Sequence, residues 1–241
     1  MKRLITILSQ KWPEYLLEIL VITIGILGAF ALNNWNDNRR LQVERQELIA
    51  DLIKDFEYNQ QLMREDKMAW SKAKISSMDL YFELLSKDQQ IVELDSLKNL
   101  AREFFFFDTF SPNLSAYQAA ESTGSLALLD SNPLLEQFTQ FTESLVTHQM
   151  VNQWSGQAFF QGSLWELRKQ VSPGTIYTSK YPYVFKNDIT FKDYQELMRT
   201  PLAQNALRNA YVLEQNSLEK LMELDSCTAK ILNLLYELER T

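Results

Sequence analysis

Residues 15–32 read YLLEILVITIGILGAFAL, and this stretch decides the fold, because Glu18 is its one charged residue and the others are apolar or small. As a helix, the segment from Pro13 to Trp35 reaches roughly 34 Å, which exceeds the hydrocarbon thickness of about 30 Å. The length and the lack of charge therefore predict one membrane-spanning helix.

Aromatic residues mark both ends of this helix. Trp12 and Tyr15 lie at one end and Trp35 lies at the other, where amphipathic rings favour the headgroup boundary. A polar run then follows the apolar one. We expect residues 1–37 to form an N-terminal tail and transmembrane anchor, and residues 38–241 to form a water-soluble helical domain.

Two other interpretations of the apolar stretch stay open. Ala29, Phe30 and Ala31 form the small-x-small pattern of a signal-peptidase site, so the segment fits a cleaved signal peptide. Against this interpretation stand the long N-terminal flank and the carboxylate of Glu18. A helix buried in a soluble protein is the other alternative, although such helices seldom run this long without a polar face.

Within the anchor, Glu18 is the candidate functional charge. The side chain lies about 4.5 Å inside the boundary at Tyr15, so it reaches back to the interface; pairing with another subunit and proton or ion conduction are the alternatives. Gly25, Gly28 and Ala29 form a pattern that permits close approach of a second helix.

The composition favours helices over other fold classes. The 241 residues are 46% hydrophobic, which suffices for a core, while only six Gly and six Pro are available for tight turns. A net charge of -7 without a basic face argues against a nucleic-acid partner. Cys227 is the single cysteine, which excludes an intrachain disulfide and a cysteine metal cluster.

Apolar periodicity divides the domain into helices. One long amphipathic helix is predicted from about residue 38 to 86, with Asn59 and Asp66 interrupting its apolar seam. Shorter helices are expected at 96–107, from Ser111-Pro112 to a stop at Gly124, at 134–152 after Asn132-Pro133, at 157–171 and at 191–198. Thr200-Pro201 opens a last helix of about 40 residues, long enough to pair antiparallel with the helix that follows the anchor.

The fold class is therefore all-α: one transmembrane helix followed by an elongated bundle whose N- and C-terminal helices are long. Residues 175–190 break the helical pattern and are predicted to form a surface loop. Its aromatic side chains are the candidate partner-contact residues, namely Tyr177, Tyr181, Tyr183 and Phe185.

No recognisable catalytic set is present in the sequence. His148 is the single histidine and is expected to be a surface or packing residue. The chain has no Glu-x-x-His, P-loop, dinucleotide or paired-cysteine motif, so neither a cofactor nor a metal site is predicted. Glu214 and Glu219 are interpreted as a solvated acidic face, and Phe104–Phe107 as core.

Two segments carry a resemblance to a known family. Tyr15–Arg40, YLLEILVITIGILGAFALNNWNDNRR, resembles the opening of an uncharacterised bacterial family of single-pass membrane proteins, in which Glu-Ile-x-Val leads to Asn-x-Trp-Asn. Ala116–Leu129, AYQAAESTGSLALL, is similar to a Ser-Gly turn between helices of that family. The resemblance implies an uncleaved anchor in a bacterial inner membrane and supplies no activity, ligand or catalytic residue.

These observations favour a membrane-anchored, non-enzymatic interaction or scaffold protein. Its expected partners are the lipid bilayer and either another protein or a second copy of the chain. The positive charges on the two sides of the anchor nearly balance, with Lys2, Arg3 and Lys11 before it and three arginines after it. We favour a cytoplasmic N-terminus and a periplasmic domain. The alternatives are a sensory or ligand-binding bundle, and an accessory subunit of a transport or motor complex that uses Glu18.

Overall fold

The computed structural model describes residues 2–87, 92–170, 173–176 and 189–240. All regular structure in these residues is helical, which confirms the all-α prediction. The elements in chain order are α1 (Lys2–Gln61), the π-helix η1 (Leu62–Met68), α2 (Ala69–Leu85), α3 (Leu94–Ala101), the 3-10 helix η2 (Arg102–Phe105), α4 (Ser115–Thr123), the 3-10 helix η3 (Ser125–Leu129), α5 (Asn132–Phe160), α6 (Ser163–Gln170), α7 (Pro173–Ile176), α8 (Phe191–Met198) and α9 (Pro201–Glu239).

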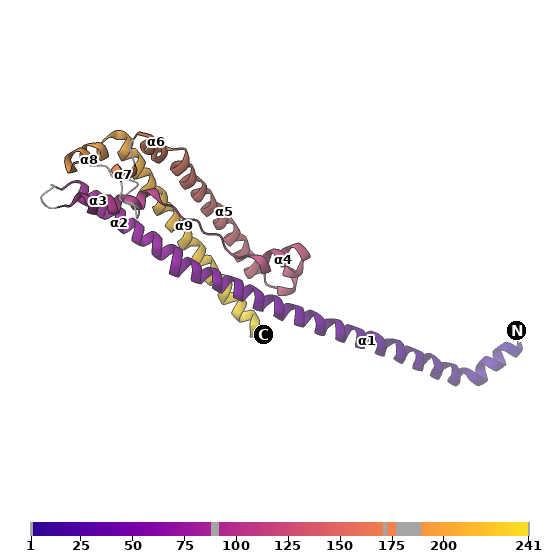
Figure 1. Ribbon diagram of the computed structural model, residues 1–241. Helices are drawn as coiled ribbons and strands as arrows, with labels where there is room; N and C mark the ends of the chain where they lie inside the picture. The colour runs from indigo at the N-terminus through magenta and orange to yellow at the C-terminus, as the bar shows by residue number, and fades with distance from the viewer. Residues whose placement is uncertain (1, 88–91, 171–172, 177–188, 241) are drawn as a thin grey trace.

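The molecule is organised around one very long helix. α1, η1 and α2 follow one another without a break, and Leu16–Leu85 forms a continuous helix of 70 residues. The N-terminal half of α1 projects alone from the bundle, with the N-terminus at its far end (Figure 1). Ile49 is the first buried residue of α1 within the described side chains. A bare stalk of about 20 Å therefore separates Trp35 from the bundle.

The π-helix η1 explains how this long helix keeps one face on the core. Along the buried face of α1, Ile49, Leu52, Phe56, Asn59 and Met63 follow one another at intervals of three or four residues, as an α-helix requires. Met63 and Met68, by contrast, are five apart. The wider π turn accommodates one extra residue, so both methionines stay on the buried side. As a result Asp66, which falls on the predicted seam, is turned to the solvent.

α9 lies between α5 and the long helix (Figure 1). It runs antiparallel to α1, as predicted, so Tyr236 near its end donates a hydrogen bond to Glu57 of α1. Two hydrophobic clusters fill the bundle. The cluster nearer the projecting half of α1 includes Phe56, Phe138 and Leu235, and the cluster farther from it joins α2, α3, α6, α8 and the start of α9.

The predicted helix start at Ser111-Pro112 is wrong. α4 begins at Ser115, and residues 106–114 form an extended strap along the bundle. The cap comes from α1: Asp55 accepts hydrogen bonds from Ser115 Oγ (3.0 Å) and the Ala116 backbone N–H (2.9 Å). Asn59 holds the strap through both backbone groups of Asn113, at 2.7 Å each. The Asn113 side chain adds a local contact by accepting from the Ser115 backbone N–H at 3.2 Å. The tertiary contact with Asp55 therefore acts together with the local sequence to set this helix start.

Other boundaries agree in part with the sequence. Gly124 ends α4 with a φ of 77°, as predicted. α5 is capped by Ser131 and runs to Phe160, well beyond the predicted end near residue 152. The chain turns after α5 at Gly162, where a Cβ would lie 2.8 Å from the backbone of Ala158, so this close approach requires glycine.

The last part of the chain also agrees in part. α8 and α9 have the predicted limits, and the Thr200 hydroxyl accepts from the Ala203 N–H at 3.3 Å. Residues 173–176 form α7, so the start of the predicted loop is a helical turn. Tyr177, Tyr181, Tyr183 and Phe185 lie outside the described residues.

Candidate functional site

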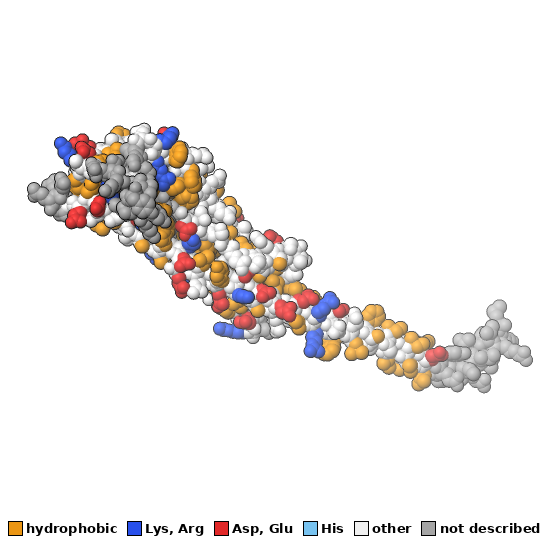
Figure 2. All heavy atoms as spheres, in the orientation of Figure 1, with side chains coloured by type: hydrophobic (Ala, Val, Ile, Leu, Met, Phe, Trp, Pro, Cys, Tyr) orange, Lys and Arg blue, Asp and Glu red, His pale blue; other side chains and the backbone are white. Residues whose placement is uncertain are grey.

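The projecting half of α1 is the first candidate site. It is long and apolar enough to cross a membrane by length and composition. Figure 2 shows apolar side chains around this part of the helix and charged ones over the bundle. Leu27 and Leu32 are 62% and 68% exposed, so the bundle covers no part of this segment.

The sequence-predicted site residues of the anchor all lie on this bare helix. Glu18 is exposed, and no atom lies within 4 Å of a Cβ built at Gly25 or Gly28. Gly25 precedes the buried Leu52 by about seven and a half helical turns. By the same count Gly25 and Ala29 face away from Leu52, whereas Gly28 precedes the buried Ile53 by about seven turns and lies on the side of that residue.

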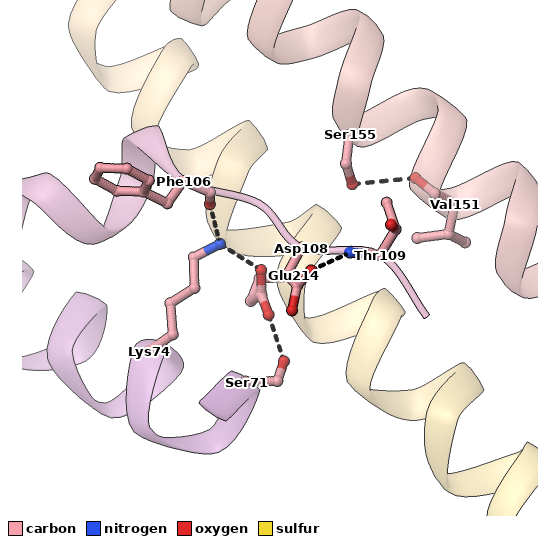
Figure 3. A network of polar contacts seen from close by, with 8 residues as sticks. All are labelled: Ser71, Lys74, Phe106, Asp108, Thr109, Val151, Ser155 and Glu214. Atoms are coloured by element: carbon pink, nitrogen blue, oxygen red, sulfur yellow. Dashed lines mark hydrogen bonds and ion pairs between the residues drawn. The ribbon is translucent and has the colours of Figure 1, made fainter. Parts of the chain in front are cut away.

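A buried ion pair is the main polar feature of the bundle interior (Figure 3). Lys74 Nζ of α2 lies 2.5 Å from Glu214 Oε2 of α9, and the two side chains are 3% and 9% exposed. Lys74 also donates to the Phe106 carbonyl of the strap and lies 4.8 Å from the centre of the Trp70 ring. Ser71 donates to the second oxygen of Glu214. The network thus joins α2, α9 and the strap.

The expectation that Glu214 is solvated is therefore wrong, whereas Glu219 is exposed. The sequence contained the signal. Five buried residues of α9 recur at intervals of seven, with Glu214 second in the series: Leu207, Glu214, Leu221, Thr228 and Leu235. Two turns of an α-helix bring such positions back to one face, and the apolar members place that face on the core.

His148, predicted to be a surface or packing residue, is a packing residue. It is 1% exposed, lies edge-on to Phe110 and shares a hydrogen bond of 3.0 Å between its Nε2 and the Asn152 amide. Its Nδ1 has no partner. Burial lowers the pKa of His148 to about 4, so the ring is neutral near pH 7.

The cavities beside the ion pair are small. One lies between Lys74 and the strap phenylalanines and measures about 20 Å³, and the other, beside His148, measures about 10 Å³. Each has room for about one water molecule. Within the residues that the structure describes, no three His, Cys, Asp or Glu side chains are placed to hold a metal ion. Phe104 and Phe105 are core, as predicted, but Phe106 is 47% exposed.

The outer face of α5 is a surface that the sequence analysis did not identify. Val146, Met150 and Trp154 follow one another at helical spacing and are 52%, 45% and 48% exposed. Beside Trp154 lies an open groove of about 560 Å³ between α5 and α9, whose lining contains no charged residue: Trp154, Gln157, Ala158, Gln161, Gly162, Asn209 and Leu213. The missed signal is a run of 22 residues, Ser144–Trp165, without Asp, Glu, Lys or Arg.

A second groove, of about 690 Å³, lies between α1 and α9 and differs in chemistry. Lys54 and Arg64 line it together with Glu57 and Glu65. The hydrogen bond from Tyr236 to Glu57 and the ion pair of Arg64 with Asp225 (2.7 Å) join its two helices. These charged groups are solvated or paired within the chain itself.

Comparison with known proteins places the chain in a family without giving it an activity. No curated protein and no solved structure matches it. A family model described as a family of unknown function, DUF6090, matches residues 18–156, which is more than half of the 241 residues. This match confirms the expectation of an uncharacterised family, and it covers most of the projecting apolar segment, most of the long helix and most of α5. The chain belongs to DUF6090, a family of unknown function.

Proposed function

We propose that this protein is a membrane-tethered, non-enzymatic interaction protein that holds a helical bundle at a fixed distance from a bilayer. The observation that carries the proposal is the bare apolar half of α1, which continues without a break into a core helix of the bundle. An anchor joined in this way holds the bundle rigidly.

Burial in lipid accounts for the exposed side chains of this segment. Its large apolar side chains from Leu16 to Leu32 are 48% to 68% exposed. Moving each one from water into lipid stabilises the membrane-inserted state by about 1.5–3 kcal/mol. Trp35 lies at the end of the apolar run with the Arg39 guanidinium 5.9 Å from its ring centre. An aromatic ring followed by a cation is typical of a headgroup boundary.

The surface of the bundle favours an interaction role. Interface cores are depleted of charge and enriched in Trp and Met, and the outer face of α5 has both properties. The internal cavities leave little room for an organic ligand, which supports a surface site over an internal one.

Two lysines in the anchor test the attachment. Ile24→Lys with Leu27→Lys places charges at the bilayer centre at a cost of about 2.5–3.5 kcal/mol each. We expect this double variant to leave the membrane pellet on alkaline carbonate extraction. Leu41→Lys with Val43→Lys is the matched control on the bare stalk, at side chains 40% and 47% exposed, and should stay in the pellet. Equal extraction of both variants contradicts the anchor.

The side of the membrane has a separate test. The proposal puts the bundle outside a bacterial inner membrane, and Cys227 is the one native thiol, half-buried on α9. A membrane-impermeant maleimide should label it in intact spheroplasts of a bacterial host, as completely as in detergent-opened cells. Labelling that appears only after the cells are opened places the bundle in the cytoplasm and reverses the topology.

A further inference from the structure

We infer that the charge-free outer face of α5, with the groove beside it, is the surface through which two copies of this chain pair in one membrane. The inference rests on the proposed anchoring and names the partner of the bundle. Val146, Met150 and Trp154 form the raised part of this pairing face, and Leu213 and Asn209 of α9 lie in its hollow.

Charge selects this face for contact between identical chains. Each copy carries a net charge of -7, so two copies repel one another through most of their surfaces. Between Ser144 and Trp165 no side chain is charged, and the groove lining contains none. Contact through this face therefore brings no like charges together and desolvates no charged side chain. The α1–α9 groove, by contrast, would bury Lys54, Glu57, Arg64 and Glu65.

Shape makes the same face complementary to itself. A two-fold symmetric dimer uses one patch twice, so that patch must contain both a projection and a hollow. Trp154 is 48% exposed and forms one wall of the groove of about 560 Å³. A two-fold operation therefore brings the Trp154 of each copy toward the hollow of the other. Tryptophan is the side chain most suited to such an anchor position.

The orientation of α5 suits two copies in one bilayer. Met150 follows the buried Phe141 by nine residues, about two and a half turns, so it points away from the core. α5 runs along the length of the bundle, on the other side of α9 from α2 (Figure 1). A two-fold axis along the bundle thus joins two α5 faces while both anchors enter the same membrane.

The size of the pairing face predicts that the membrane contributes to pairing. Val146 to Phe160 spans about 21 Å, which for a helix about 10 Å wide gives an area well below the roughly 800 Å² per partner of stable complexes. Confinement to a bilayer raises the effective concentration of weak partners. We therefore expect pairing to fall when the anchored chains are diluted with lipid.

Cysteine cross-linking of the purified full chain in phosphatidylcholine vesicles tests the inference. In a Cys227→Ser background, Met150→Cys should give a cross-linked dimer with a short bis-maleimide. Met222→Cys is the matched control, because Met222 is 50% exposed against 45% for Met150. It follows Leu213 by nine residues and so lies on the opposite side of α9 from the groove. We expect at least fivefold more dimer for Met150→Cys, and less on lipid dilution.

The possible outcomes separate the inference from the anchoring. Equal yields at both positions, or a higher yield at Met222, overturn the pairing face while chains that float with the vesicles still support the anchor. Chains that do not float contradict the anchoring, and the inference falls with it. Trp154→Ala in the Met150→Cys chain should lower the yield severalfold with an unchanged helical circular dichroism signal. An unchanged yield there removes Trp154 from the contact and contradicts the inference.

Discussion

At the scale of single residues, the Lys74–Glu214 pair is the most consequential polar contact in the bundle. The ammonium group of Lys74 has three partners: a carboxylate oxygen of Glu214 on α9, the Phe106 carbonyl oxygen on the strap, and the Trp70 ring. Its three N–H donors therefore face two acceptors and a ring. A buried pair of this kind adds little net stability but strongly penalises the loss of one member. Its main effect is therefore to fix α2, α9 and the strap in one arrangement.

This reasoning predicts a strong asymmetry between single and double variants. Lys74→Met leaves the carboxylate of Glu214 buried without its cation and should lower the free energy of unfolding by about 3–5 kcal/mol. Lys74→Met with Glu214→Met removes both charges and should recover most of this loss. Urea unfolding of the detergent-solubilised chain, followed by circular dichroism, measures the free energy of unfolding of these two variants and of Glu214→Met alone. If the double variant loses the sum of the two single losses, the pair is not coupled.

Single residues also show where sequence reasoning succeeded and where it failed. The neighbourhood of His148, between apolar residues on a helix, was enough to predict a surface or packing residue, and the structure shows that it is buried. Glu214 was misjudged because glutamates are usually solvated, and only its place among the seven-residue intervals of α9 indicates burial. Its cation is 140 residues away in the chain, and no local pattern predicts which lysine meets it.

At the scale of elements, the π-helix η1 is the point where a regular helix would fail. An α-helix through residues 62–68 would turn every later core residue by about 100° relative to the earlier ones. The extra residue in η1 absorbs this mismatch, which keeps Lys74 and Met78 on the same side as Phe56 and Met63.

Single-residue deletions test this role. Deleting Asp66 shortens the interval from Met63 to Met68 to four residues, so η1 can become α-helical with both methionines still buried. Deleting Lys72, which is also charged and exposed, puts α2 out of phase with the core. We expect the Asp66 deletion to unfold cooperatively and to be more stable than the Lys72 deletion by at least about 2 kcal/mol in urea. Equal losses would show that η1 does not compensate the register.

Element boundaries were predictable where the cap is local. Thr200-Pro201 opens α9 because the Thr200 hydroxyl meets a nearby backbone N–H, and Gly124 ends α4 because it tolerates a positive φ. The start of α4 was not predictable, since its capping carboxylate belongs to Asp55, 60 residues earlier. The position of η1 was not predictable either. The sequence shows only that Met63 and Met68 are five residues apart, and the structure is needed to show that both are buried.

At the scale of the whole molecule, the apolar run and the two long amphipathic patterns were enough to predict a separate apolar helix and an antiparallel pair of long helices. The pairing face was not predictable in the same way, because exposure depends on which side of α5 the other helices cover. An uncharged run such as Ser144–Trp165 is compatible with full burial, and only the packing of α5 on α9 shows that Val146, Met150 and Trp154 stay outside.

The unbroken helix would also explain how such a small face could serve as the proposed contact. The cavity lined by Lys74 and Ser155 shows that Trp154 lies near the level of Lys74, about 58 Å along the helix from Trp35. A flexible linker of that length would present the face at varying heights and orientations, which would lower the effective concentration of matching faces. In the proposed arrangement, a rigid helix fixed at the headgroup boundary would present Trp154 of every copy at one height, so that encounters in the bilayer plane would bring like positions together.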